Sequence, residues 1–244
     1  MEVRTERAEE ARAAMLELFP EGFEEVERDD GVELAAYTTA AGEERLWRVF
    51  GGAHVSDVDA EWEVRWRDFH RPIRLGPLWV GPPWETPDPD AVAVVIDPGR
   101  AFGTGAHSTT QLCLEALLEL ERGSLLDVGC GSGVLAIAAA LSGFAPVVGV
   151  DIEAASIAAT IENAAVNRVE VAAQRVGPDD PLPLADVAVA NISLDAVLRL
   201  PERLAAPVLV TSGYLETEAP DLAGYRRVAR RLRDGWAVDV HRRI

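Results

Sequence analysis

A glycine-rich turn between two apolar segments constrains the fold of this chain more than any other feature. The turn reads Gly129-Cys130-Gly131-Ser132-Gly133, with a strand pattern over 125–128 before it and a helix pattern over 134–141 after it. Glycine permits such a sharp turn and lets the backbone approach a ligand closely. Asp151 ends the next strand pattern, about 20 positions further on, where an acidic residue typically binds ribose hydroxyls. The sequence therefore predicts a site for a ribose-containing ligand.

Strand and helix patterns alternate from about residue 91 onward. Strands are expected at residues 91–96, 125–128, 147–150, 169–174, 187–190 and 208–211. Helices are expected at residues 109–120, 134–141, 154–166 and 194–204. Short apolar strands separated by helices predict an α/β fold with a parallel, doubly wound sheet. The segments Tyr225–Arg231 and Trp236–His241 flank Asp234-Gly235 and predict an antiparallel hairpin at the end of that sheet.

The N-terminal part, residues 1–58, has a different pattern. A strand is expected near Val3, followed by a helix at residues 8–18 and a strand pair at 23–27 and 32–37. A second helix at 43–50 and a last strand at 54–58 complete the order. This βαββαβ order predicts a small ferredoxin-like α+β domain. Residues 59–90 are rich in proline and tryptophan and predict a stiff, packed linker. Its tryptophans are interpreted as inter-domain packing, with a substrate-facing role for one of them as the alternative. Residues 91–244 then form the C-terminal domain.

Charge and composition exclude several classes of function. The formal net charge of −18 argues against stable nucleic-acid binding, because phosphate contacts require clustered cations. An acidic surface instead suits a basic macromolecular partner. The chain contains no lysine, which excludes lysine Schiff-base chemistry and a P-loop lysine. The arginines near the C-terminus are interpreted as a solvated face.

The two cysteines, Cys113 and Cys130, predict neither a metal site nor a disulfide framework. Cys113 is expected in the core, and Cys130 is expected to fill a small space in the turn rather than to act as a nucleophile. No apolar run approaches the roughly 20 residues that cross a membrane, and the first residues lack a signal-peptide pattern. We therefore expect a soluble cytoplasmic protein.

The spacing around the turn distinguishes between cofactors that contain ribose. A nicotinamide fingerprint requires G-x-G-x-x-G/A, but Val134 occupies its third small position. The observed pattern is D-x-G-x-G-x-G, which begins at Asp127 and resembles the first motif of S-adenosylmethionine-dependent methyltransferases. This cofactor has no pyrophosphate, which agrees with the altered turn.

The segment Asp97–Thr110 reads Asp-Pro-Gly-Arg-Ala-Phe-Gly-Thr-Gly-Ala-His-Ser-Thr-Thr and leads into a helix. Ser108 is expected to cap this helix, with Gln111 completing a capping box. A helix N-terminus favours a carboxylate, such as that of a methionine moiety. Thr110 is expected either to donate a hydrogen bond to the cofactor or only to cap the helix. His107 is expected to order the loop rather than to take part in catalysis.

Asn191 follows the strand pattern at 187–190, where a doubly wound sheet borders its ligand crevice. Its carbonyl can accept a hydrogen bond from an incoming amine, and alignment of the reacting atoms is the main contribution that methyl transfer needs from the protein. A protonated amine cannot attack, and desolvation would lower its pKa from about 10.4. Asn191 is the predicted catalytic residue, and no residue is singled out as a general base.

Asp97–Thr110 resembles the signature of the PrmA-type methyltransferases, and the resemblance continues through the glycine turn, Asp151 and Asn191. It also extends back through Trp62–Pro72 and Leu78–Trp84. It implies a class I methyltransferase fold and S-adenosylmethionine binding at Thr110, Gly129, Asp151 and Asn191. It also implies methylation of the α-amine and lysine side chains of a large-subunit ribosomal protein, numbered eleven, that the N-terminal domain recognises. The remaining predicted cofactor contacts are Phe102, Gly103, Thr104 and Gly131.

The chain departs from this family after Asn191, where Ile192-Ser193-Leu194-Asp195 stands in place of the usual small residues. The departure bears on the substrate-facing loop more than on the cofactor site. Lysine methylation of another protein and methylation of a small molecule on the same scaffold are alternatives. A catalytically silent cofactor-binding protein and a nicotinamide oxidoreductase are alternatives from other classes. The protein is expected to be monomeric.

Overall fold

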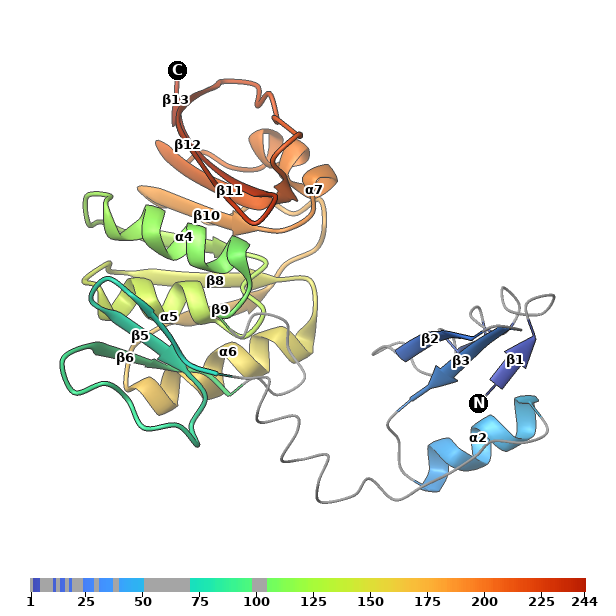
Figure 1. Ribbon diagram of the computed structural model, residues 1–244. Helices are drawn as coiled ribbons and strands as arrows, with labels where there is room; N and C mark the ends of the chain where they lie inside the picture. Colours follow the sequence, from blue (N-terminus) through green and yellow to red (C-terminus); the bar gives the residue numbers. More distant parts are fainter. Residues whose placement is uncertain are drawn as a thin grey trace. The chain divides into compact units, whose positions relative to one another are not determined.

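The computed structural model describes residues 2–4, 11, 14, 15, 18, 24–28, 31–36, 40–50, 71–97 and 105–244. The chain divides into two compact units, Met1–Glu63 and Val64–Ile244 (Figure 1). In the described residues no helix is long and apolar enough to cross a membrane.

The N-terminal unit contains a three-stranded antiparallel sheet in the order β1-β3-β2. Its elements are β1 (Glu2–Arg4), β2 (Glu24–Arg28), β3 (Gly31–Ala35) and helix α2 (Ala40–Phe50). Residues 11, 14, 15 and 18 are helical, and Ala11 and Met15 share a core with Val32, Leu34 and Leu46. The strands and helices agree with the first five elements of the predicted βαββαβ order. The sixth, expected at 54–58, lies outside the described residues, so the ferredoxin-like assignment stays a prediction.

The second unit begins with a small sheet of β4 (Ile73–Leu75), β5 (Leu78–Gly81) and β6 (Val92–Val95). Strand β5 runs antiparallel to β4 and parallel to β6. Strands β4 and β5 fall within residues 59–90, where the sequence predicted a packed linker. Strand β6 was expected in the large sheet, and this was wrong. Central parallel strands are buried on both faces, whereas Val92 is exposed and only Val94 of β6 is fully buried.

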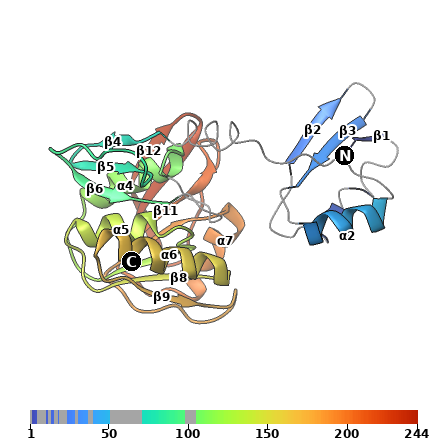
Figure 2. The same cartoon turned by 90° about the horizontal axis from the view of Figure 1, so that it is seen from below.

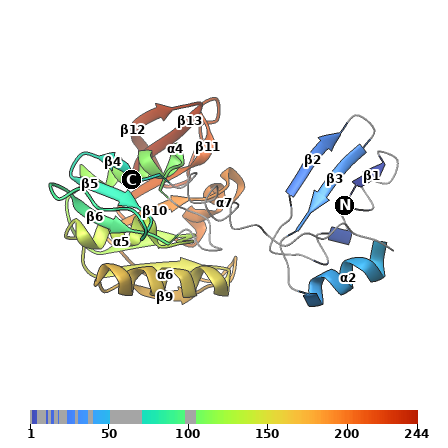
Figure 3. The ribbon, with the colours of Figure 1, turned by 60° about the horizontal axis from the view of Figure 1, so that its bottom comes forward.

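The large sheet has seven strands in the order β12-β13-β11-β10-β7-β8-β9. Their bounds are β7 (Leu125–Val128), β8 (Val147–Asp151), β9 (Ala172–Arg175), β10 (Val187–Asn191), β11 (Val208–Leu215), β12 (Tyr225–Arg233) and β13 (Trp236–Arg243). The strands from β11 to β9 pair in parallel, and β13 pairs antiparallel with both β11 and β12. The predicted doubly wound sheet and its closing hairpin are therefore confirmed. Figure 3 shows the hairpin at the edge of the sheet opposite β9.

Successive residues of each central strand enter different cores, because side chains alternate between the faces of a sheet. Leu125 packs in one core and Leu126 in the other. The first core also contains residues of helices α4 (Ser108–Leu118), α5 (Val134–Leu141) and α6 (Ala154–Asn167). The second contains residues of α7 (Leu194–Arg199) and the 3-10 helix η2 (Leu200–Glu202). Helices thus cover both faces of the sheet.

The small sheet packs against the first group of helices (Figure 2). Leu75, Leu78 and Val80 are buried in the same core as α4 and α5. Helix α6 also holds β6 through a side chain, since the Asn167 amide donates to the Val95 carbonyl and accepts from its N–H at 2.8 Å. Residues 73–96 are therefore part of the second unit.

Candidate cofactor site

A cavity of about 500 Å³ lies at the carboxyl ends of β7, β8 and β10. This size falls within the range of small-molecule sites, about 300–1,000 Å³. Gly129, Gly131, Asp151 and Asn191 line it together with Ile192. A second cavity of about 500 Å³ is lined by apolar residues apart from Glu170. The first cavity, which contains the Asp151 carboxylate and the Asn191 amide, is therefore the candidate cofactor site.

The glycine turn is held by backbone hydrogen bonds to the neighbouring strand. The N–H groups of Gly129 and Cys130 donate to the Val150 carbonyl at 2.8 and 3.1 Å. Gly129 has φ of +75°, and a Cβ atom there would lie 2.4 Å from Ile192 Cγ2. Glycine is required on both counts, because an L side chain is strained at this φ and has no space.

The Asp151 carboxylate is fixed at the end of β8 by two backbone donors. Oδ2 accepts from the Gly131 N–H and Oδ1 from the Glu153 N–H, each at 3.0 Å. A carboxylate has about four acceptor positions, so these bonds orient it and leave capacity for two hydroxyl groups. The remaining acceptor positions therefore fit the hydroxyl groups of a ribose.

Asp127 lies beneath the turn with 1% of its surface exposed. The Ala136 N–H at the start of α5 donates to Oδ2 at 3.1 Å, and Oδ1 has no hydrogen-bond partner within the described ranges. Burial raises the pKa of Asp127 to about 7, with a smaller contribution from the charge of Asp151 and an opposing one from the Ala136 N–H. This carboxyl group binds the first turn of α5 and does not line the cavity.

Asn191 is joined to the first turn of α4. Its side-chain amide nitrogen donates to the Thr110 hydroxyl at 3.3 Å. This orientation leaves the amide carbonyl as the atom that can accept a hydrogen bond at the cavity. Thr110 is buried, with 1% exposed, and is not among the cavity-lining residues. Its observed contact is with Asn191.

A family model described as "Ribosomal protein L11 methyltransferase (PrmA)" matches residues 16–239 of this chain. The chain belongs to the PrmA family. It is 45% identical to "Ribosomal protein L11 methyltransferase" of Aliivibrio fischeri (strain MJ11) in an alignment of 178 residues, which covers 68% of this chain and 60% of that relative. It is 40% identical to the protein of the same name from Methylococcus capsulatus over 233 residues, with 85% and 77% covered. The match thus spans only about three-fifths of the Aliivibrio relative.

A solved structure supports the same family. The "ribosomal protein L11 methylase" from Lactobacillus delbrueckii subsp. bulgaricus is 29% identical and superposes with a TM-score of 0.63, covering 71% of this chain and 99% of that chain. Together with the strand order, this similarity confirms the predicted class I methyltransferase fold.

The start of α4 in this PrmA chain differs from the prediction. His107 is the N-cap, and its ring accepts from the Thr109 N–H at 3.4 Å. Ser108 is already helical and donates to Asp234 Oδ2 at 2.7 Å, while Gln111 donates to the Ala106 carbonyl. The predicted capping box was therefore wrong, because the β12–β13 turn supplies an acceptor for Ser108 that lies 126 positions away.

His107 makes its contacts at the start of α4, and its expected role in ordering the rest of the loop stays a prediction. Its Nδ1 atom lies 2.7 Å from the Thr109 hydroxyl, and its ring packs edge-on against Trp236 at 5.0 Å between centroids. Of the predicted cofactor contacts in this segment, Phe102, Gly103 and Thr104 lie outside the described residues. The cofactor roles of the other predicted residues stay predictions.

Sequence reasoning missed the polar residues of α6 that brace the PrmA turn. The Thr160 hydroxyl donates to the Gly131 carbonyl at 3.0 Å. The Asn163 amide donates to the Ser132 carbonyl at 2.9 Å and accepts from the Asp97 N–H at 3.0 Å. The spacing of Thr160, Asn163 and Asn167 puts them on one face of the helix. Polar residues on a face that packs against the sheet were the available signal.

Both cysteines are buried, as predicted. Burial, the charge of Asp127 and, less, that of Asp151 raise the pKa of Cys130 to about 12, against hydrogen bonds that lower it. Cys130 is therefore a thiol at neutral pH and not an activated nucleophile. Within the described ranges no three His, Cys, Asp or Glu residues could hold a metal ion.

The C-terminal arginines were interpreted as a solvated face, and four of them, although partly exposed, also form ion pairs. Arg231 pairs with Glu119, and Arg233 pairs with Glu115 at 2.9 Å. Arg227 and Arg230 face Asp239 at 3.7 and 3.2 Å. Arg231 and Arg233 pair with acidic groups at α4, whereas Arg227 and Arg230 pair with Asp239 on β13, the neighbouring strand of the same hairpin.

Proposed function

We propose that this protein binds S-adenosylmethionine and transfers its methyl group to amines of a large-subunit ribosomal protein. Membership of the PrmA family supports the reaction, and the names of the relatives supply the acceptor, ribosomal protein L11. The observation that carries the proposal is one cavity lined by the Asp151 carboxylate, the Gly129 turn and the Asn191 amide.

Asp151 would hold the ribose, since its two oxygens are oriented by the Gly131 and Glu153 N–H groups. Gly129 and Gly131 let the backbone approach the cofactor without a side chain in the way. S-adenosylmethionine supplies, when bound, an electrophilic methyl group on a sulfonium sulfur. Asn191 would contact the methionine end from β10. Thr110 of α4 is proposed to take part through its hydrogen bond with the Asn191 amide.

Asn191 is proposed as the catalytic residue. Its carbonyl oxygen accepts a hydrogen bond from the acceptor amine and so aligns the nitrogen lone pair for attack. The bond from its amide nitrogen to Thr110 fixes the direction of that carbonyl. Alignment of this kind supplies much of the rate, because the reaction needs little covalent help. The amine must be neutral, and desolvation in the site favours that form.

The acceptor is proposed to be the α-amine and lysine side chains of the basic ribosomal protein, which the net charge of −18 would attract. Residues 1–58 are proposed to recognise this protein. The methyltransferase domain is proposed to include β4 and β5 as well as residues 91–244, because both strands pack in its core. We further propose a monomer that acts in the cytoplasm. Other proteins and small amines on the same scaffold are the alternative acceptors.

The test uses purified full-length protein, S-adenosylmethionine with a labelled methyl group, and purified ribosomal protein L11. We expect label in L11, located by mass spectrometry, and loss of transfer in Asn191→Ala. If L11 stays unlabelled while another cytoplasmic protein or free lysine accepts label, the acceptor is wrong and the chemistry stands. If calorimetry detects binding of a nicotinamide dinucleotide and not of S-adenosylmethionine, the proposal fails as a whole.

A further inference from the structure

We infer that Ile192 is a positioning residue, held between Gly129 and Gly213, that sets the place of Asn191 relative to the cofactor turn. This inference rests on the proposed function, because it assigns a residue to the methyl-transfer site. Ile192 immediately follows Asn191 and itself lines the cavity.

The first contact is between the side chain of Ile192 and the turn. A Cβ atom at Gly129 would lie 2.4 Å from Ile192 Cγ2, with Ile192 Cβ next at 3.9 Å. The Ile192 methyl group therefore packs directly on the Gly129 backbone. This contact limits how closely the Asn191 segment and the turn can approach.

The second contact is between the backbone of Ile192 and β11. Gly213 has φ of +99°, and a Cβ atom there would lie 2.0 Å from the Ile192 carbonyl oxygen and 2.7 Å from its carbonyl carbon. The Ile192 N–H donates to the Ser212 carbonyl at 3.2 Å. Pairing of β11 with β13 is irregular between Ser212 and Tyr214, so Gly213 is the bulged residue. The bulge supports Ile192 from the side opposite the turn.

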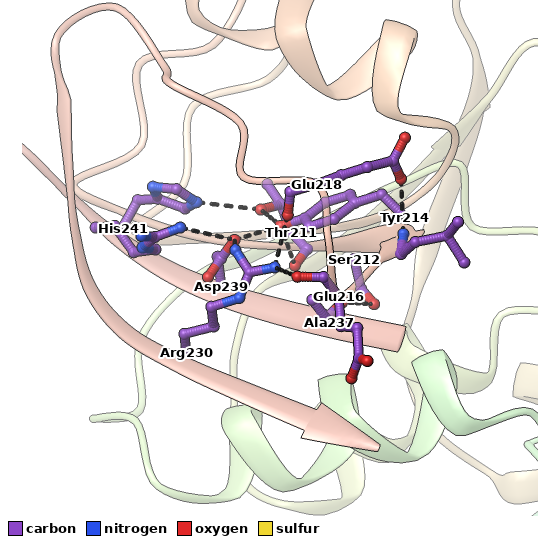
Figure 4. Close-up of polar contacts among 11 residues, drawn as sticks. Thr211, Ser212, Tyr214, Glu216, Glu218, Arg230, Ala237, Asp239 and His241 are labelled. Atoms are coloured by element: carbon purple, nitrogen blue, oxygen red, sulfur yellow. Dashed lines mark hydrogen bonds and ion pairs between the residues drawn. The ribbon is translucent and has the colours of Figure 1, made fainter. Parts of the chain in front are cut away.

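A buried polar network holds this bulge in place (Figure 4). The Tyr214 hydroxyl lies 2.7 Å from the Thr211 hydroxyl and donates to Asp239 Oδ2 at 3.0 Å. The Ser212 hydroxyl donates to the Ala237 carbonyl at 2.7 Å. Tyr214, Thr211 and Asp239 have at most 1% of their surface exposed. The residues on both sides of Gly213 are therefore fixed to β13.

Arg230 closes the network from β12. Its guanidinium lies 3.2 Å from Asp239 and donates to the carbonyls of Glu216 and Glu218 at 2.9 and 2.6 Å. Asp239 is fully buried, whereas the Arg230 side chain is 20% exposed, and separating the two would leave the buried carboxylate uncompensated. The bulge therefore cannot readily move away when a group presses on it, and displacement falls on Ile192 instead.

Displacement of Ile192 would move the neighbouring Asn191 relative to both Gly129 and Thr110. A misplacement of about 1 Å can reduce the rate of an enzyme by about 100-fold. Ile192 thus acts through Asn191, by fixing the distance between the acceptor side and the cofactor turn.

The first experiment compares Gly213→Ala with Gly224→Ala in the full-length protein. Both glycines have positive φ, at +99° and +76°, but a Cβ atom at Gly224 would meet nothing within 4 Å. The two variants share the backbone strain, and only the first presses on Ile192. We expect kcat for methyl transfer to fall about 100-fold in Gly213→Ala while Gly224→Ala keeps wild-type kcat. Equal kcat values in two folded variants would overturn the inference.

The second experiment uses binding of S-adenosylhomocysteine, measured by calorimetry, and does not depend on activity. Gly129→Ala should weaken binding, and Ile192→Ala should partly restore it in the double variant, because the obstructing atom is a side-chain methyl. Ile192→Ala should not restore kcat to Gly213→Ala, whose obstructing atoms are backbone. Strictly additive effects of Gly129→Ala and Ile192→Ala on the Kd of S-adenosylhomocysteine would overturn the inferred contact between Ile192 and the turn. Absence of methyl transfer to L11 by the wild-type protein would instead contradict the proposed function and leave this binding comparison valid.

Discussion

The Asn191 amide nitrogen lies 3.3 Å from the Thr110 hydroxyl, joining the end of β10 to the first turn of α4. Thr110 is buried and Asn191 is partly buried, so water competes weakly for this hydrogen bond. The pair connects two segments separated by 81 positions and orients the proposed catalytic amide.

Replacement of Thr110 tests this orientation. Thr110→Val keeps the shape of the side chain but leaves the Asn191 N–H group without its acceptor, which costs about 1–3 kcal/mol. We expect kcat to fall roughly tenfold, and Thr110→Ser, which retains the hydroxyl, to stay near wild type. Steady-state kinetics with saturating cofactor and acceptor separate these outcomes. Equal rates for the valine and serine variants would show that the bond does not orient Asn191.

Replacement of Asp151 tests the proposed ribose contact. Asp151→Asn removes the charge that strengthens hydrogen bonds from hydroxyl groups, and such bonds contribute about 1.5–3 kcal/mol. We expect the Kd for S-adenosylmethionine to rise about 10- to 100-fold, measured by calorimetry. The matched control is Glu162→Gln, which makes the same charge change on the exposed surface of α6. A similar Kd for the two variants would argue against the contact.

Asp127 predicts an unusual dependence of stability on pH. Its pKa is raised from 3.8 to about 7 in the folded protein by burial. The unfolded chain therefore releases this proton first as pH rises, and stability falls between about pH 4 and 7. Asp127→Asn has no proton to release, so its free energy of unfolding should exceed that of wild type increasingly across this window. Urea unfolding at several pH values measures the difference, which should disappear below pH 4. Parallel pH profiles would contradict the burial of a titrating carboxyl group.

The buried His241 side chain should make stability depend on pH in the opposite direction, with a loss as the pH falls. Burial lowers its pKa below 6.5, with Asp239 raising it and Arg227 lowering it further. As pH falls through 6.5 the unfolded chain binds a proton before the folded protein does, so stability is lost. His241→Gln can keep a hydrogen bond to Thr211 and cannot titrate. Its Tm, measured by scanning calorimetry, should decline less than that of wild type as pH is lowered below 6.5. An unchanged slope would show that His241 does not contribute.

Local patterns predicted most of the second unit. The turn at Gly129, the carboxylate at Asp151 and the hairpin at Asp234-Gly235 all depend on the conformational preferences of short segments. Strand β6 was misassigned because a short apolar run does not reveal which sheet it joins. Val94 of β6 pairs with Val80 of β5. This pairing depends on a tertiary contact, because both side chains are buried in the core that contains α4 and α5.

The site was predicted less completely than the fold. Asp151 and Asn191 follow from their positions at strand ends, where a doubly wound sheet binds its ligands. The hydrogen bonds of Asn163 and the packing of Ile192 between Gly129 and Gly213 do not follow from any motif. Their roles depend on which backbone atoms happen to lie opposite them in the folded chain.

The sequence by itself determined the strands of the large sheet, the helices that cover it, the tight glycine turns and the positions of polar residues at strand ends. These follow from periodicity and from backbone freedom within a few residues. The tertiary structure alone decided that Ser108 binds Asp234 rather than capping its helix, that Arg230 binds Asp239, and that Gly213 lies against Ile192. Each of these contacts requires segments distant in the chain to meet at a definite distance. That distance is set by the packing of the whole sheet and not by any local preference.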